Sequence, residues 1–254
     1  MKAATPMFEV GLARDAQERE QALRLRYCVF VEELGGDGPL VDHQARIECD
    51  AFDPSAQMLV LRDRARPEGE QVVGVYRLIQ SNGSADQAFY SAQEYDLSPL
   101  LQSGLRLLEL GRSCLHPDYR GGAAMYHLWQ GLADYVRREG IDILFGVASF
   151  HGTNPDALTQ PLSMLHCNHL APEAFRVRSR QAQGITLLRE DQINRVAAVQ
   201  AMPALIKAYL RLGGYLGEGV FVDHAFNTTD VCLVMETARL NERQKAIYAG
   251  QGRP

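Results

Sequence analysis

Residues that could bind charged groups lie close together in the first half of the chain. Three carboxylates fall within six residues of the stretch ECDAFD, at Glu48, Asp50 and Asp53. Carboxylates on a polar loop can hold a cation, and an arginine can hold a carboxylate through two parallel hydrogen bonds. Candidate arginines are Arg26, Arg77 and Arg112. This combination favours binding of a small charged ligand; the alternative is that the charges form ion pairs that hold the loop to the sheet.

A second group of candidate residues lies in the turn HPDYRGG, which precedes a predicted helix. Backbone N–H groups at a helix N-terminus attract anions, and Arg120 adds a positive charge next to Gly121 and Gly122. Ala123 and Met125 stand where a nucleotide-binding loop would have small flexible residues. The turn is therefore predicted to bind an anion, but to wrap a pyrophosphate less tightly than such a loop does; the alternative is a plain tight turn.

The stretch ELGRSC, just before that turn, is predicted to be part of a strand. In a regular strand Glu109 and Ser113 point to one face, and Arg112 and Cys114 point to the other. A bulge would change this parity and could bring Glu109 and Arg112 to the same face. Cys114 has no evident histidine partner, so we expect a small buried thiol rather than a nucleophile.

A helix is predicted over residues 14–36, where Asp15 can cap the start and Gly35 suits the end. Apolar residues recur on one face of this helix at Leu23, Tyr27, Phe30, Val31 and Leu34. The polar segment that follows has little periodicity, and an unstructured segment of this length inside a compact domain is often functional.

The elements expected next are a hairpin over 57–63 and 71–80, a strand over 105–116, a helix over 123–140 and an apolar strand over 141–149. The last strand fits a position buried on both faces, with the helix as the crossover from the preceding strand.

The second half shows weaker patterns. We expect helices over 154–170 and 202–214, and strands over 175–180, over 184–188 and twice within 219–236; Pro161 interrupts or restarts the first helix. The prediction is one α/β domain over 1–254, with a core over 8–150, an α/β extension over 151–237 and a polar tail over 238–254.

Composition limits the classes of function. The 254 residues carry a net charge of -5, so the chain has no global basic footprint for nucleic acid. No apolar run reaches the ~18 residues of a membrane span, and the first ten residues lack the apolar core of a signal peptide. The five scattered cysteines favour reduced thiols in a cytoplasmic protein.

Three stretches together resemble the GCN5-related N-acyltransferase (GNAT) superfamily, and within it the ornithine-lipid N-acyltransferases. They are RLRYCVFVEELG with IECDAFD, then GRSCLHPDYR, and then LIKAYLRLGG with FNTTDVCLV. The first half is also similar to the acyl-homoserine-lactone synthases, a sister family, through an Arg-x-x-Val-Phe pattern ending at Phe30, the acidic cluster, Arg77, and the Glu-x-x-Arg pair Glu109 and Arg112. Each short pattern is weak alone, but their joint occurrence in this order is specific.

The resemblance implies the GNAT fold, a mixed central sheet with splayed strands flanked by helices. It implies an enzyme that transfers a 3-hydroxy fatty acyl group from acyl-carrier protein to the α-amine of an amino acid. Ornithine is the expected acceptor and a lyso-ornithine lipid the expected product. No metal and no tightly bound cofactor are expected, because the co-substrate is the phosphopantetheine thioester on the carrier protein.

Amide formation from a thioester needs a held thioester, a neutral amine, a proton acceptor and stabilisation of the oxyanion. Glu48 is the leading candidate base, acting directly or through a water, and Glu109 is the alternative. The amino-acid site is expected to comprise Arg26, Phe30, Asp50, Asp53, Arg77 and Arg112. The pantetheine arm is expected to contact Ser113, Cys114, Leu115, Arg120, Gly121 and Gly122. The altered turn favours the single phosphate of a carrier protein over the pyrophosphate of coenzyme A.

Two other functions stay open. One is an acyl-homoserine-lactone synthase that uses S-adenosylmethionine, against which the long second half argues. The other is a non-catalytic protein that only binds acyl-carrier protein or lipid, against which the retained Glu48, Glu109 and Arg120 argue. The lipid product also leads us to expect peripheral contact with the inner face of the cytoplasmic membrane.

Three further features are better explained by packing. The stretch HCNH (His166, Cys167 and His169) would need a fourth ligand from elsewhere to bind a metal. Trp129 is expected in the core, with the lining of an acyl tunnel as the alternative. The amphipathic helix over 202–214 is expected to pack on the core, with docking on a membrane surface as the alternative.

Overall fold

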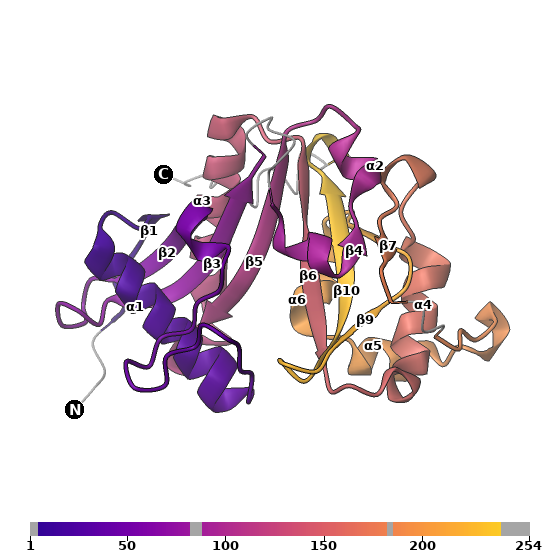
Figure 1. Ribbon diagram of the computed structural model, residues 1–254, viewed down its shortest axis with the longest axis horizontal. Helices are drawn as coiled ribbons and strands as arrows, with labels where there is room; N and C mark the ends of the chain where they lie inside the picture. Colours follow the sequence, from indigo (N-terminus) through magenta and orange to yellow (C-terminus); the bar gives the residue numbers. More distant parts are fainter. Residues whose placement is uncertain (1–4, 82–87, 182–184, 240–254) are drawn as a thin grey trace. The chain divides into compact units, whose positions relative to one another are not determined.

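The computed structural model describes residues 5–81, 88–181 and 185–239, so most of the predicted polar tail lies outside the described residues. The chain forms two compact units, each built from segments far apart in the sequence (Figure 1). Among the described residues, the first unit contains residues 5–79 and Leu110–Gly140, and the second contains Gln80–Glu109 and residues 141–239. The division into a core over 8–150 and an extension stays a prediction.

The strands of the first unit form an antiparallel meander. β1 (Phe8–Leu12) pairs with β2 (Gln57–Asp63), and β2 pairs with β3 (Val72–Gln80). The register of the second pair shifts between Leu61 and Arg62. The predicted hairpin is therefore confirmed, and β1 is an edge strand that the sequence patterns did not reveal.

The first helix changes its geometry part-way along. α1 (Ala16–Arg26) is capped by Asp15, whose side chain accepts from the Glu18 N–H at 2.8 Å, and Gly35 follows with φ +73°. Residues Tyr27–Glu33 form a π-helix, η1, in which Leu34 N–H bonds to Val29 O. Because a π-helix joins residues five apart, the apolar face rotates there. The predicted face is therefore wrong at Leu34, which is exposed.

Two helices cover the two faces of this meander. Ala22 and Leu25 of α1 pack with Met58 and Val60 of β2 in one buried cluster. α3 (Ala124–Glu139) packs on β1 and β2, and it approaches β1 so closely that a Cβ at Gly131 would lie 2.4 Å from Val10. Alternate residues of a strand point to opposite faces, so the inner strand is buried on both.

The second unit contains a mixed sheet, as predicted. β6 (Ile143–His151) pairs antiparallel with β10 (Thr228–Glu236) over its whole length. It also pairs in parallel with the first three residues of β5 (Leu107–Leu115), so α3 is the predicted crossover connection between β5 and β6. β8 (Tyr215–Leu216) and β9 (Phe221–Asp223) both pair with β10.

The other elements of the second unit are short. A separate two-stranded sheet contains β4 (Tyr95–Asp96) and β7 (Arg178–Ser179), and the helices are α2 (Ser98–Leu101), α4 (Thr159–His169), α5 (Arg195–Ala201) and α6 (Ala204–Arg211). Short 3-10 turns occur in both units at Asp53–Ser55, Tyr90–Gln93, Pro117–Tyr119, Pro155–Leu158, Glu173–Phe175, Glu190–Gln192 and Thr237–Arg239.

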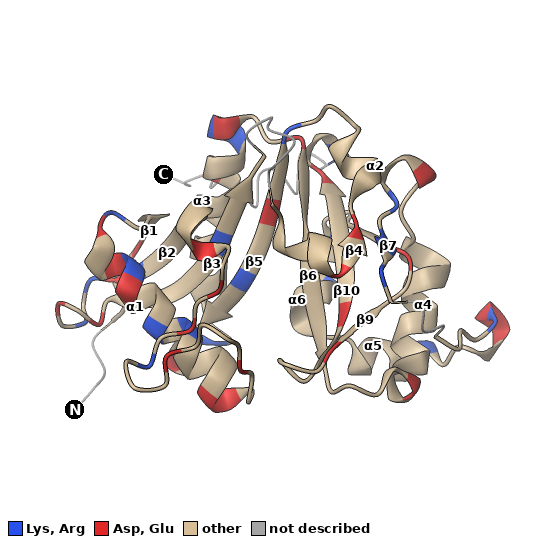
Figure 2. Ribbon diagram, viewed as in Figure 1, with Lys and Arg blue, Asp and Glu red and all other residues tan. Residues whose placement is uncertain are grey.

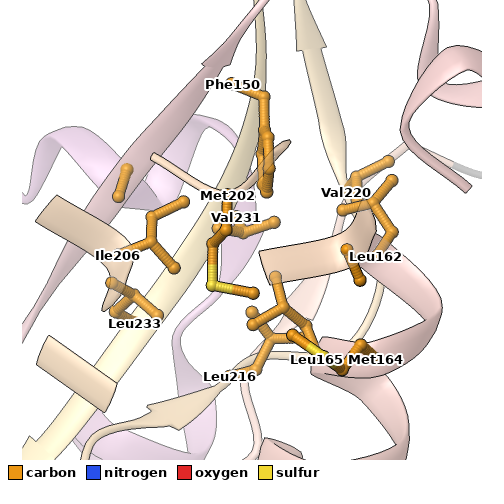
Figure 3. Close-up of a cluster of buried hydrophobic side chains, with 12 residues drawn as sticks. Phe150, Leu162, Met164, Leu165, Met202, Ile206, Leu216, Val220, Val231 and Leu233 are labelled. Carbon is orange, nitrogen blue, oxygen red and sulfur yellow. The ribbon is translucent and has the colours of Figure 1, made fainter. Parts of the chain in front are cut away.

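The core of the second unit forms between its helices and the sheet (Figure 3). Leu162 and Leu165 of α4, Met202, Ile206 of α6 and Val231 of β10 belong to one buried cluster. Pro161 lies in the first turn of α4, where a proline costs no backbone hydrogen bond. The predicted strand over 184–188 is wrong, because 185–188 form no strand. Among the described residues no helix is long and apolar enough to cross a membrane.

The ion pair between Glu18 and Arg62 predicts a loss of stability in acid. Arg62 is buried and donates to both oxygens of Glu18, and this hydrogen bonding lowers the pKa of Glu18 from 4.5 to about 2. The stabilisation is complete above the unfolded pKa and disappears as the pH falls from 4.5 towards 2. After solvent screening we expect about 1–2 kcal/mol. In urea titrations between pH 6 and pH 3, Glu18→Gln removes this part of the pH dependence.

Glu20→Gln is the matched control, since Glu20 lies on the same helix in an exposed pair with Arg24. The assignment is refuted if the two variants show the same pH dependence of the free energy of unfolding.

Candidate active site

The centre of the candidate site is a buried group of three charged side chains in the first unit. Arg26, at the end of α1, donates from Nε to Glu48 Oε2 at 2.5 Å. Its Nη1 and Nη2 donate to the two oxygens of Asp53 at 2.6 and 3.0 Å. The side chain of Arg26 is 0% exposed, that of Glu48 1% and that of Asp53 5%. Buried ion pairs therefore hold the acidic loop against α1.

Three further charged residues extend this group towards solvent. Arg77 of β3 donates to Asp50 Oδ2 at 2.5 Å, and Arg112 of β5 donates to the same oxygen at 3.0 Å. Arg112 also donates from Nε to Glu48 Oε1 at 3.1 Å. Asp50 is the most accessible of the three carboxylates, at 19%, and Arg112 the most accessible arginine, at 10%. Figure 2 shows acidic and basic residues together around α1 and β3.

The structure thus brings together the five charged residues of the predicted amino-acid site and the candidate base Glu48, and they pair with one another. Burial alone would lower the pKa of Arg26, but the carboxylates of Glu48 and Asp53 outweigh burial and raise it. Burial would raise the pKa of Asp53, but hydrogen bonds from Arg26 lower it. Phe30, the sixth residue of the predicted amino-acid site, is half-buried against the core of this unit.

An irregularity in β5 directs Arg112 towards the acidic loop. Arg112 has φ +49°, which is a left-handed backbone conformation. Residues other than glycine rarely adopt it, and it interrupts a regular strand. A Cβ at Gly111 would lie 3.5 Å from Arg77, and Arg112 bonds to the same Asp50 as Arg77 does. Two successive positions therefore face one ion pair, and the alternation expected for a regular strand is broken at Arg112.

Glu109 lies in the second unit and has different surroundings. It is buried, and its two oxygens accept the backbone N–H groups of Tyr90 and Ser91 at 2.8 and 2.6 Å. These bonds hold the turn at Tyr90–Gln93. The carboxylate also lies near Cys232, whose pKa is raised by burial and by Glu109.

The predicted donor-binding residues follow along β5. The Ser113 Oγ is buried and has no hydrogen-bond partner among the described residues. Leu115 is buried, and burial raises the pKa of the Cys114 thiol to about 12. A thiol that stays protonated at neutral pH is a poor nucleophile, which agrees with a packing role for Cys114.

The predicted anion-binding turn contains an ion pair that the sequence analysis missed. Arg120 donates from Nη1 and Nη2 to the two oxygens of Glu33 at 2.6 and 2.7 Å. Gly121 follows with φ +74°, and α3 begins at Ala124. Glu33 and Arg120 lie 87 positions apart, so no local pattern in the sequence could have revealed this pair.

The features assigned to packing can be placed as well. In the HCNH stretch, His166 Nδ1 bonds to Leu162 O and its Nε2 accepts the Gly219 N–H, so both ring nitrogens are engaged. Trp129 is half-buried and donates to the Tyr76 hydroxyl at 3.1 Å.

Comparisons with known proteins identify the fold and the domain. A model of the acetyltransferase (GNAT) domain matches residues 25–130. The solved structure of FeeM, an N-acyl amino acid synthase from uncultured soil microbes, is similar with a TM-score of 0.53 at 14% identity, covering 92% of this chain and 93% of that one. The AHL synthase LasI gives a TM-score of 0.52 at 16% identity, covering 96% and 95%. The fold is thus that of the GNAT acyltransferases and their AHL-synthase relatives.

Closer relatives identify the family. The chain is 58% identical over 251 residues to the L-ornithine N(alpha)-acyltransferase of Rhodobacter capsulatus, covering 98% of this chain and 97% of the relative. It is 41% identical to the enzyme of the same name from Brucella abortus, covering 96% and 89%. The chain belongs to the L-ornithine N(alpha)-acyltransferase family, in agreement with the resemblance seen in its sequence.

The buried ion pairs predict that Arg26 is needed for stability. Arg26→Gln leaves Glu48 and Asp53 with fewer charged donors in a buried place, which costs about 3–5 kcal/mol. Arg24→Gln is the matched control, because Arg24 lies two residues earlier on the same helix in an exposed pair. Its replacement should change the free energy of unfolding by less than about 0.5 kcal/mol. Urea denaturation of both variants measures the difference. Equal stability of the two variants would show that the buried pairs do not hold the loop.

Proposed function

We propose that this protein transfers a 3-hydroxy fatty acyl group from acyl-carrier protein to the α-amine of ornithine, forming a lyso-ornithine lipid. The observation that carries the proposal is the full-length match to L-ornithine N(alpha)-acyltransferases, at 37–58% identity in four relatives. The acid and arginine cluster supports it, because ornithine carries charges of both signs. The amine forms the new C–N bond, and the thiol of the donor leaves as the C–S bond breaks.

The amino acid would enter at the accessible end of the cluster. Asp50 is the carboxylate most open to solvent and can receive an ammonium group, while Arg112 can receive the α-carboxylate. Arg26, Asp53 and Arg77 are more deeply buried and act by holding this end in place. An incoming amino acid would then exchange ion pairs with Asp50 and Arg112 instead of creating unpaired charges.

Glu48 is the proposed proton acceptor. Its Oε2 is held by Arg26 and its Oε1 by Arg112. If the substrate carboxylate draws Arg112 away, Oε1 becomes available to accept the proton of the ammonium group, directly or through a water. The alternative base, Glu109, would first have to release two backbone N–H groups, which makes it the less suitable candidate.

The donor is proposed to bind along the end of β5 and the following turn. The buried Ser113 Oγ is available to the pantetheine arm or the oxyanion, and Cys114 and Leu115 would line the same stretch. Arg120, Gly121 and Gly122 precede α3, whose first N–H groups attract an anion. A single phosphate on acyl-carrier protein suits this turn. Because the product is a lipid, peripheral membrane contact of a cytoplasmic protein is part of the proposal.

The assay that tests the proposal uses the purified protein, a 3-hydroxyacyl-carrier-protein thioester and a panel of amino acids, with products identified by mass spectrometry. Acyl-ornithine is the expected product. Lactone formed with S-adenosylmethionine would point to the synthase alternative, and binding of the carrier protein without any product would point to the non-catalytic one.

The same assay distinguishes the two candidate bases. Glu48→Gln should lower kcat by about 10²-fold, the usual contribution of a general base. Because it also removes a buried partner of Arg26, its melting temperature should fall, and kcat is compared at a temperature where the variant is folded. Glu109→Gln is compared in parallel. Near-full activity of Glu48→Gln with a large loss in Glu109→Gln would transfer the role to Glu109.

A further inference from the structure

The ion pair between Glu33 and Arg120 occupies the arginine that is proposed to bind the donor phosphate. Glu33 is the last residue of η1, and Arg120 follows the 3-10 turn at Pro117–Tyr119. Both oxygens of Glu33 accept hydrogen bonds from Arg120, so the guanidinium group already binds a carboxylate through two nitrogens. The side chains are 39% and 41% exposed, which leaves the pair open to exchange with a dissolved anion.

Arg120 has a second acceptor besides Glu33. Its Nε and Nη2 both donate to the carbonyl oxygen of Leu115 at 3.3 Å. This backbone acceptor belongs to β5, so it holds the guanidinium beside the turn without any help from η1. Replacing Glu33 should therefore free the charge of Arg120 without displacing the side chain.

The carboxylate of Glu33 is present as a negative charge at neutral pH. The hydrogen bond from Arg120 lowers the pKa of Glu33. An anion that approaches Arg120 must displace this carboxylate and also meets its charge. Exposed ion pairs are weak, so displacement is feasible, but it reduces the net gain from binding.

We propose that Glu33 competes with the phosphate of the acyl donor for Arg120 and thereby sets how tightly the donor binds. Glu33 is then a determinant of donor affinity that does not itself touch the reacting atoms. This inference rests on the proposed role of Arg120 in binding the donor.

The test is the Kd of the holo-acyl-carrier protein, measured by calorimetry without the amino acid, so that it does not depend on turnover. Glu33→Gln should bind about two- to fivefold more tightly than the wild type, the range expected for removal of an exposed pair. In the acyl-transfer assay the KM for the acyl-carrier-protein thioester should fall by a similar factor. Weaker or unchanged binding by Glu33→Gln would overturn the inference.

The neighbouring residue provides a matched control. Glu32 precedes Glu33 in η1, is 41% exposed and pairs with Arg46 at 2.5 Å, so Glu32→Gln removes the same charge from the same helix. Its Kd should equal that of the wild type. If Glu32→Gln tightens binding as much as Glu33→Gln, the cause is net charge acting at a distance, and the competition is refuted.

Arg120→Gln separates this inference from the function on which it rests. It should weaken binding and abolish the effect of Glu33→Gln in the double variant. If Arg120→Gln leaves Kd unchanged, both the competition and the donor role of Arg120 are refuted, while acyl-ornithine formation still decides the overall function. If Arg120→Gln weakens binding but Glu33→Gln has no effect, only the competition is refuted. Equal melting temperatures show that the variants fold.

Discussion

The candidate site depends on the buried contact in which Arg26 holds Glu48 and Asp53. Two carboxylates removed from water are costly unless charged donors replace their hydration, and the planar fork of one arginine does this for both. The loop over 48–53 has little regular structure of its own, yet it cannot leave α1 without exposing a buried arginine. The same contact therefore fixes the place of Asp50, the residue that solvent can reach.

The charged cluster contains as many arginines as carboxylates, and this balance limits the kinds of ligand that would bind there. Arg26, Arg77 and Arg112 face Glu48, Asp50 and Asp53, so the cluster has no net formal charge. A ligand with only one kind of charge would leave part of the cluster without a partner. In the proposed function an amino acid would bring both kinds and exchange partners at the outer end, which would link the electrostatics of the cluster to the substrate class. The proposal for Arg120 uses the same principle, since the carboxylate of Glu33 would be replaced there by the phosphate of the donor.

Much of the fold could be predicted from local signals in the sequence. Asp15 and Gly35 marked the ends of the first helical segment, and the apolar run at β6 indicated a buried strand after a crossover helix. The π-helical turn escaped prediction because apolar spacing was interpreted with the period of an α-helix, whereas a π-helix joins residues five apart. The left-handed conformation of Arg112 could not be predicted, because nothing in ELGRSC determines to which face of the strand each side chain points. The Glu33–Arg120 pair joins residues 87 positions apart and leaves no local trace.

The most direct test of the account is a crystal structure of the protein with ornithine bound. We predict that the α-carboxylate of ornithine lies within hydrogen-bonding distance of Arg112 and that an ammonium group lies against Asp50, with Arg26 still holding Glu48 and Asp53. Ornithine bound elsewhere, with the contacts of Asp50 and Arg112 unchanged, would contradict the claim that this cluster is the amino-acid site.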